Sequence, residues 1–421
     1  MATSFVCKIY NHFEEVTDPR VNRGANHPLI EMIFLTLCAS ICDAEGWVDV
    51  ERYGNAKLDW LRKFFPFENG IPSHDTLGRV FSRLDTLEFY AALQSWANEI
   101  AGSLRGQTIA VDGKTLRGSH DGANGKSALH SISAWACGLR MCIGLNSVDD
   151  ESNEIPAAQE LIRLLDLQGA VVTADAMHCQ TETAKAIVSK DADYILTVKG
   201  NQPALQEVLN TTLLKAMDNE DPKLRRCQSG ETTRRRAEIR EVVVLPAPKH
   251  CSVLAGWEGI KTIGLIYRSR EINGQVQESS ETFISSLAPK VRDHAKRIRE
   301  HWGIENKQHW ILDVTFSEDS SRIRKGSSPE ISSVFRRLAL SILQRDTTIK
   351  DNIRGKRKRC SWDNSMIERL IKHFSSISRA IALGVTGALP RRWLRVKQDV
   401  GCGLGVTGAL PRRWLRVKQG A

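Results

Sequence analysis

The chain has 421 residues, and its 41% hydrophobic content is enough to build buried cores in two or three domains. Lys and Arg number 59 against 49 Asp and Glu, and the formal net charge of +10 fits a polyanionic partner or simply a basic, solvated surface. The ten cysteines are scattered without CysXxxXxxCys spacing, which argues against a disulfide framework or a structural zinc site.

The beginning of the chain indicates neither secretion nor a membrane anchor. Residues 1–16 include Glu14 and Glu15 and lack the apolar core of a signal peptide. The longest apolar stretch, Leu29–Cys42, is about 14 residues long, whereas a membrane span needs roughly 20. We therefore expect a cytoplasmic protein without a membrane partner.

Residues 5–101 have apolar side chains at helical spacing, and we expect a small all-helical N-terminal domain. One helical face carries Ile33, Leu37 and Ile41. The segment Pro72–Thr76 has the composition of a helix start with Ser73 as N-cap.

From residue 107 to 199 the pattern changes to alternating strands and helices. We expect a strand at 108–112, a hairpin within 131–147, a helix at 157–165, a strand at 170–175, a helix at 182–189 and a strand at 193–199. This order is that of an RNase H-like fold. A doubly wound sheet with acidic residues at strand ends by chance is the alternative. The predicted fold class is α/β, an RNase H-like mixed sheet.

The RNase H-like domain is expected to span 106–345, with a β-rich insertion at about 201–290. The insertion holds three β-like runs, 241–245, 261–268 and 281–286. Helical periodicity then resumes over 291–311 and 332–343.

Residues 346–421 are expected to form a basic C-terminal tail. The segment 383–398 recurs without change as 404–419, and two identical short units do not make a solenoid. We interpret the repeat as a recent duplication or read-through. The basic run Arg354–Arg359 fits an electrostatic arm or a flexible linker.

Three acidic residues stand out along the chain. Asp112 and Asp175 each close an apolar run, and Glu305 lies far downstream in a helical segment. Acids at strand ends meet at one edge of a sheet, and Mg²⁺ prefers such oxygen ligands. Glu305 is less distinct, because the nearby acids Glu300, Asp313, Glu318 and Asp319 compete with it.

Four ordered motifs resemble the DDE transposases of the H-repeat-associated insertion-sequence group. They are Ala110–Gly118, Ala174–Gln180, Asp193–Gln202 and His301–Asn306. The resemblance extends over about residues 8–373 and includes the helical N-terminal domain, which is then a candidate DNA-binding domain.

The resemblance implies that Asp112, Asp175 and Glu305 are a catalytic triad that binds two Mg²⁺ ions, or Mn²⁺ in their place, in an RNase H-like core. Related transposases carry Arg four residues before the glutamate and Lys seven after it, where this chain has His301 and Leu312. Phosphate contacts are therefore expected from other residues.

The candidate nucleic-acid-binding residues share a basic or amide side chain near a motif or in the insertion. They are Lys114, Lys199, Asn201, Gln202, Arg234, Arg235, Arg236, His301 and Arg324. Each also has an ordinary interpretation as a turn residue, a hydrogen-bonded histidine or a solvated loop.

The favoured hypothesis is a DNA transposase that acts as a homodimer on double-stranded DNA, at the terminal inverted repeats of its element and at target DNA. Two alternatives remain open. One is an RNase H-like nuclease without strand transfer, and the other is an inactive DNA-binding remnant.

Overall fold

A computed structural model describes residues 2–20, 26–120, 125, 127–148, 153–233, 236–272 and 275–382. Its N-terminal part is helical, as expected. The helices are α1 (Ala2–Phe13), α2 (Leu29–Ile41), α3 (Trp47–Leu61), α4 (His74–Phe81) and α5 (Thr86–Ala101). The Ser73 side chain accepts a hydrogen bond from the Thr76 amide, which confirms the predicted N-cap of α4. Asp85 caps α5 in the same way.

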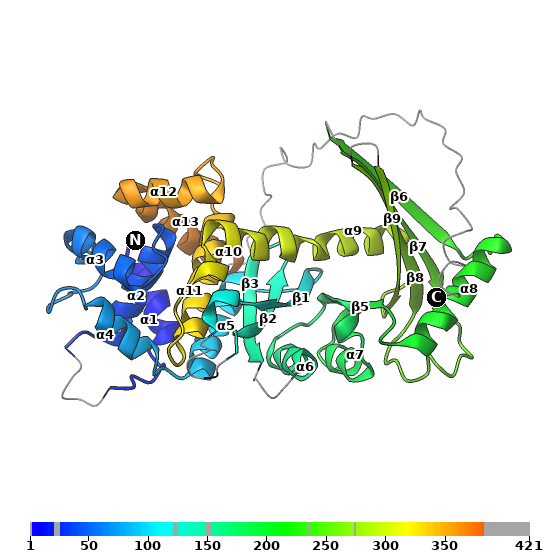
Figure 1. The fold of residues 1–421 in the computed structure, drawn as a ribbon, viewed down its shortest axis with the longest axis horizontal. Coiled ribbons are helices and arrows are strands. Elements are labelled where there is room, and N and C mark those ends of the chain that lie inside the picture. The colour runs from blue at the N-terminus through cyan, green and yellow to red at the C-terminus, as the bar shows by residue number, and fades with distance from the viewer. Residues whose placement is uncertain are drawn as a thin grey trace.

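The centre of the molecule is a mixed sheet with an RNase H-like arrangement (Figure 1). Its first five strands are β1 (Thr108–Thr115), β2 (His130–Ala136), β3 (Met141–Val148), β4 (Val171–Ala174) and β5 (Asp193–Val198). The strands β1, β2 and β3 form an antiparallel meander, whereas β4 runs parallel to β1 and β5 parallel to β4. This topology places the carboxyl ends of β1 and β4 side by side.

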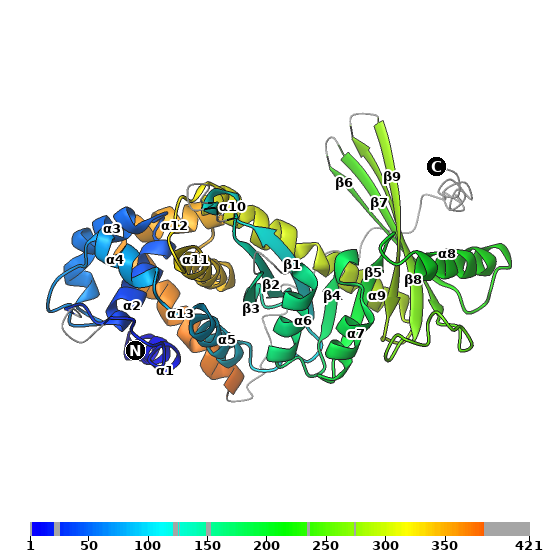
Figure 2. The same cartoon turned by 60° about the horizontal axis from the view of Figure 1, so that its bottom comes forward.

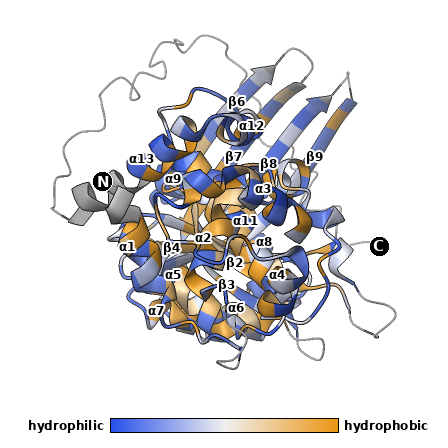
Figure 3. Cartoon of the chain, turned by 90° about the vertical axis from the view of Figure 1, so that its left-hand side faces the viewer, coloured by the Kyte–Doolittle hydropathy of each residue, from blue (hydrophilic) through white to orange (hydrophobic). Residues whose placement is uncertain are grey.

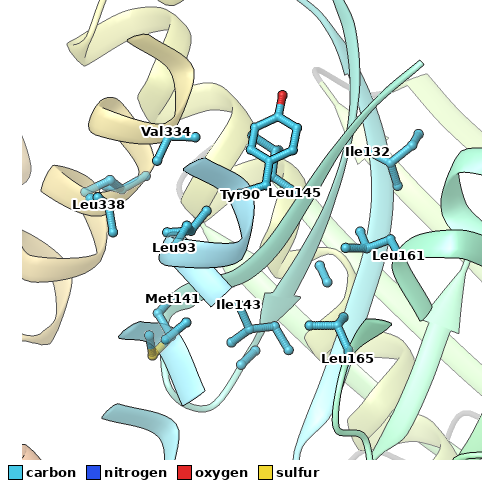
Figure 4. Packing of buried hydrophobic residues seen from close by; sticks show 14 of the residues in the cluster. Tyr90, Leu93, Ile132, Met141, Ile143, Leu145, Leu161, Leu165, Val334 and Leu338 are labelled. Atoms are coloured by element: carbon cyan, nitrogen blue, oxygen red, sulfur yellow. The ribbon is translucent and has the colours of Figure 1, made fainter. Parts of the chain in front are cut away.

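Helices cover both faces of this sheet (Figures 1 and 2). The helices α6 (Glu154–Leu164) and α7 (Thr181–Val188) lie on one face, and α9 (Val291–His301) crosses the other. Alternate strand residues point to opposite faces of the sheet, and both faces are apolar: Ile132 of β2 points to α6, whereas Leu145 of β3, the register partner of Ser133, points to the other face. Figure 4 shows them packed with residues of α5, α6 and α11 (Ser328–Arg345).

The expected insertion extends the core sheet instead of forming a separate layer. It contains a helix and four strands: α8 (Pro203–Asp218), β6 (Arg225–Thr233), β7 (Arg236–Pro246), β8 (Thr262–Ile272) and β9 (Gln275–Ser285). Because β9 pairs antiparallel with β5, all nine strands form one sheet in the order β3-β2-β1-β4-β5-β9-β8-β7-β6. Neither α8 nor β6 was among the expected elements.

The helix expected over 291–311 is interrupted. After α9, residues Glu305–His309 form a π-helical turn, and α10 (Trp310–Thr315) follows. π-Turns within helices are frequent at functional sites, because the extra residue per turn re-aims side chains. The interruption here begins at Glu305.

The expectation of a basic tail from residue 346 is wrong for the residues that the structure describes. Two helices, α12 (Ile353–Trp362) and α13 (Asn364–Ala382), pack on the N-terminal helices (Figure 2). The Trp60 indole of α3 donates to Glu368 of α13 at 2.9 Å. Figure 3 shows hydrophobic residues of α2 and α11 at the centre of this helical part. The repeated segments 383–398 and 404–419 lie outside the described residues.

The basic run Arg354–Arg359 belongs to α12 and is neither an arm nor a linker. The Arg357 side chain is fully buried, pairs with Asp43 at 3.0 Å, donates to the Ser40 carbonyl at 3.2 Å, and stacks on the Phe316 ring. It also donates to the Thr315 carbonyl, so it joins α2, α10 and α12. Within the described ranges, none of the helices combines the length and apolar character that a membrane span requires.

Candidate active site

Asp112 and Asp175 lie on neighbouring parallel strands. The register pairs Val111 with Ala174, so the next residue of each chain segment is one of the two aspartates. Asp175 directly follows β4, as predicted, whereas Asp112 lies within β1, which continues to Thr115. Asp112 is half-buried and Asp175 is exposed.

Glu305 is held over β1 and β2 by contacts of the residues before and after it in the sequence. Ile304 is buried in a small cluster with Ala110 and Trp135 on the α9 face of the sheet. The Gln308 amide donates to the Ser133 hydroxyl at 2.8 Å, and Ser133 is the register partner of Asp112 on β2. Glu305 itself is exposed.

The three carboxylates influence one another electrostatically. Burial, and then the negative charges of Asp175 and Glu305, raise the pKa of Asp112 to about 7. Partial desolvation and the charge of Asp175 also raise the pKa of Glu305. Carboxylates with raised pKa values that gather at one site have the electrostatics of a cation site.

Two histidines flank the aspartates. The His301 ring lies 3.3 Å from Asp175 Oδ1 through Nε2 and 2.9 Å from the Thr173 hydroxyl through Nδ1. The hydrogen bond with His301 lowers the pKa of Asp175. His309 Nδ1 lies 3.5 Å from Asp112 Oδ2, and burial lowers the pKa of this imidazole to about 3, so it is neutral. His301 was predicted to bind nucleic acid; in the structure it contacts the Asp175 carboxylate.

The three carboxylates are ligands of the kind that a divalent cation prefers, but their side chains are not arranged around a common point. Among the described residues, no group of three or more His, Cys, Asp or Glu side chains is close enough together to hold a metal ion as it stands. The side chains of Asp112, Asp175 and Glu305 offer hard oxygen ligands. Burial, and then neighbouring negative charge, raise the pKa values of Asp112 and Glu305, and a cation would neutralise that charge.

The acids that compete with Glu305 in sequence have other partners. Glu300 accepts a hydrogen bond from Thr108 at 2.5 Å, and Glu318 forms a fully buried ion pair with Arg337 at 3.0 Å. Asp313 and Asp319 both bind the Lys114 ammonium, at 2.5 and 3.1 Å. By contrast, the Glu305 side chain takes part in no hydrogen bond or ion pair within the described part of the chain.

The same ion pairs show where Lys114 lies. Its side chain is buried and binds two carboxylates, and its contact with a phosphate stays a prediction. Local sequence patterns could not predict these partners, because they lie about 200 positions downstream. Arg324 donates to the Gly118 carbonyl at 3.1 Å, in the turn that follows β1.

The residues after β5 lie beside Asp175. Lys199 is half-exposed and pairs with Glu281 at 2.9 Å; this hydrogen bond, and the nearby charges of Glu281 and Asp175, raise the pKa of its ammonium. Asn201 donates to the Ala176 carbonyl at 2.7 Å, and Gln202 to the Cys179 carbonyl at 3.0 Å. The two amides therefore order the turn that follows Asp175. Burial raises the pKa of the Cys179 thiol to about 12, which leaves it inert as a nucleophile.

The predicted arginine cluster of the insertion is only partly described. Arg234 and Arg235 lie outside the described residues, and Arg236 begins β7. Arg240, on the same strand, pairs with the buried Glu238 at 2.8 Å.

A groove of about 690 Å³ runs between the inner face of β6–β8 and α9, and Glu305 lies on its wall. Its basic side chains are Arg240, Arg268, Arg270, Arg299 and Lys307. The Arg268 guanidinium stacks over the Trp302 ring at 3.9 Å. The sequence did not predict this groove, since Arg268 was expected only as the end of a strand and Arg270 lay outside the expected elements. Alternation of arginines at 268 and 270 on one face of a strand was the available signal.

Comparison with known proteins identifies the family. The transposase DDE domain family matches residues 104–342, and the DDE_Tnp_1-associated domain matches residues 10–97. The chain is 35% identical to the "H repeat-associated putative transposase YhhI" of Escherichia coli K12, over 86% of this chain and 97% of the relative. It is also 35% identical to the "Putative transposase YncI" of Escherichia coli O157:H7, over 88% and 95% of the two chains.

A solved structure of the piggyBac transposase synaptic complex with hairpin DNA overlaps with a TM-score of 0.36 at 12% identity, over 94% of this chain and 81% of that one. The segment that the transposase DDE domain family matches, residues 104–342, spans all three carboxylates. The chain therefore belongs to the transposase DDE domain family and to its H repeat-associated group.

Proposed function

We propose that the protein is an active DNA transposase that cleaves DNA strands at the ends of its element and transfers them to a target. The observation that carries the proposal is the meeting of Asp112, Asp175 and Glu305 from three distant segments, with mutual effects on their pKa values. The family matches supply the reaction class.

These three carboxylates would hold the divalent cations, Mg²⁺ or Mn²⁺. Cations bound there would activate the attacking oxygen and stabilise the leaving oxygen of a phosphodiester. The protein orients the ligands: His301 holds Asp175, and neutral His309 faces Asp112. The amides of Asn201 and Gln202 hold the turn after Asp175 in place.

The groove beside Glu305 is the proposed path of a DNA strand. Arg268, Arg270 and Lys307 line it and can meet backbone phosphates, and Lys199 lies next to Asp175. Because transposition joins two ends of one element, we propose that two copies of the chain act as a homodimer. A mass measurement on the complex with end DNA tests this directly.

The test of the activity is cleavage of a labelled duplex that carries the element's own end, with Mg²⁺ or with EDTA. We expect nicking by the wild type in Mg²⁺ only, and no nicking by Asp175→Ala. Asp59→Asn, an exposed aspartate on α3, is the matched control and should cleave like the wild type.

The alternatives give different results in the same assay. End binding without nicking by the wild type identifies an inactive remnant. Nicking without joined products, when target DNA is added, identifies a nuclease without strand transfer. Nicking that persists in Asp175→Ala contradicts the assignment of the triad.

A further inference from the structure

A second group of ionisable side chains lies on the opposite face of the sheet from the triad carboxylates. Glu154, in the first turn of α6, accepts hydrogen bonds from two histidines at once. His130 Nε2 of β2 lies 2.9 Å from Glu154 Oε2, and His178 Nε2 lies 3.0 Å from Glu154 Oε1. None of these three residues belongs to the proposed metal site.

The position of this carboxylate depends on Gly113, the neighbour of Asp112. Successive strand residues point to opposite faces, so Asp112 faces α9 while position 113 faces α6. A Cβ atom on residue 113 would lie 2.3 Å from Glu154 Oε1 and 2.9 Å from His130 Nε2. Glycine therefore lets the Glu154 carboxylate lie directly against the β1 backbone next to Asp112.

The same carboxylate also reaches the segment that follows Asp175. His178 is the last residue of the short turn Ala176–His178, and its side chain is almost fully buried. The Thr115 hydroxyl lies 2.7 Å from His130 Nδ1 and ties the group to the end of β1. Burial of Glu154 opposes its ionisation, but the hydrogen bonds from His130 and His178 outweigh it and lower the pKa to about 2. These hydrogen bonds thus favour the ionised form of Glu154 between the two histidine rings.

We infer that Glu154, through His130 and His178, is a positioning residue that fixes the backbone beside Asp112 and Asp175 and thereby sets the spacing of the two aspartates. We call Glu154, His130 and His178 the rear clamp. It has no route to the substrate, because it lies behind the sheet, and it acts through the two aspartates. The inference deepens the proposed function and rests on it.

The clamp makes a prediction that a purely structural contact would not. If it sets the spacing of two cation ligands, Glu154→Ala should weaken cation binding while DNA-end binding and the thermal unfolding midpoint change little. Residues that orient metal ligands commonly change metal affinity or activity by about 10-fold to 100-fold when mutated. Glu154→Gln retains an acceptor for one histidine, and we expect it to restore part of the affinity.

The experiment is calorimetric titration of the full chain with Mn²⁺, alongside cleavage of the end duplex. Glu160→Ala is the matched control, since Glu160 is an exposed glutamate on the same helix, hydrogen-bonded to Asn146 at 3.2 Å. We expect a Kd for Mn²⁺ about 10-fold or more above that of the wild type in Glu154→Ala, a smaller rise in Glu154→Gln, and no change in Glu160→Ala.

Two results overturn different claims. The clamp alone is contradicted if folded Glu154→Ala protein binds Mn²⁺ as tightly as the wild type. If the alanine variant does not fold, the same result with Glu154→Gln contradicts the clamp. Wild-type protein that binds no Mn²⁺ contradicts the proposed function as well. Wild-type protein that binds Mn²⁺ without cleaving DNA contradicts the cleavage activity and leaves the clamp supported by the affinities of its variants.

Discussion

Asp112 and Glu318 are two acidic side chains that are shielded from water but differ in the charges around them. Glu318 is fully buried, pairs with Arg337 at 3.0 Å and accepts a hydrogen bond from Ser333 at 3.1 Å. Asp112 is half-buried beside two other carboxylates, and its pKa rises to about 7. The carboxylate at Glu318 is matched by a cation of the protein itself, whereas burial and the neighbouring carboxylates both raise the pKa of Asp112. In the proposed function, a bound divalent cation would supply the positive charge that Asp112 lacks.

Breaking the buried ion pair between Glu318 and Arg337 should reduce the stability of the fold more than any other change proposed here. Arg337→Ala leaves Glu318 buried without its cation, and we expect a loss of roughly 3–5 kcal/mol in the free energy of unfolding. Urea unfolding followed by circular dichroism measures it. A loss below about 1 kcal/mol would mean that water or another group replaces the arginine.

Removing the charge at Asp112 should increase the free energy of unfolding, in contrast to the loss expected at Arg337. Asp112→Asn should abolish Mg²⁺-dependent cleavage and yet stabilise the metal-free protein above pH 7, on the order of 2 kcal/mol, allowing for the partial solvent exposure of this side chain.

The pH dependence follows from the raised pKa of Asp112. Between pH 4 and 7 the folded state keeps a proton that the unfolded state loses, so stability falls as pH rises through this window. We expect the difference in unfolding free energy between wild type and Asp112→Asn, measured in EDTA, to grow from pH 4 to 7 and then level off. An equal difference at pH 4 and pH 8 would exclude the raised pKa of Asp112.

Arg357 sharpens the contrast, because it is a buried cation matched mostly by neutral carbonyls. Arg357→Lys keeps the charge near Asp43 but loses the forked hydrogen bonds to α2 and α10 and the stacking on Phe316. We expect a loss of roughly 1–2 kcal/mol in thermal unfolding experiments. Unchanged stability would mean that the lysine ammonium satisfies the same carbonyls.

The groove residues should affect binding more than folding. Arg268→Ala should weaken end-DNA binding by roughly 1 kcal/mol and reduce the slope of log affinity against log salt by about 1. Arg163→Ala, an exposed arginine of α6 on the other face of the sheet, is the control. Equal salt slopes for wild type and Arg268→Ala would remove this side chain from the DNA path.

The parts of the fold that follow short-range patterns could be predicted from the sequence. The apolar strands that precede the two aspartates, the hairpin of β2 and β3 and the Ser73 cap all follow from local spacing. The helix α8 also had a signal that was missed: Pro203 in its first turn, followed by Leu205, Leu209 and Leu213 at intervals of four.

The rest depends on tertiary contacts. The strand β6 is rich in polar and charged residues and pairs only with β7, so it lacks the apolar alternation of a half-buried strand. The partners of Lys114 and the burial of Arg357 depend on segments far away in the chain. Spacing along an ordinary helix also could not show the π-turn at Glu305, because that turn is set by the packing of Ile304 and Gln308 on β1 and β2.

The central claim is that Asp112, Asp175 and Glu305 form one cation site, and a structure of the protein with its end DNA and Mn²⁺ tests it most directly. We predict anomalous density for Mn²⁺ in contact with carboxylate oxygens of all three residues. Mn²⁺ bound instead at Asp313 and Asp319, with Lys114 displaced, would contradict the account.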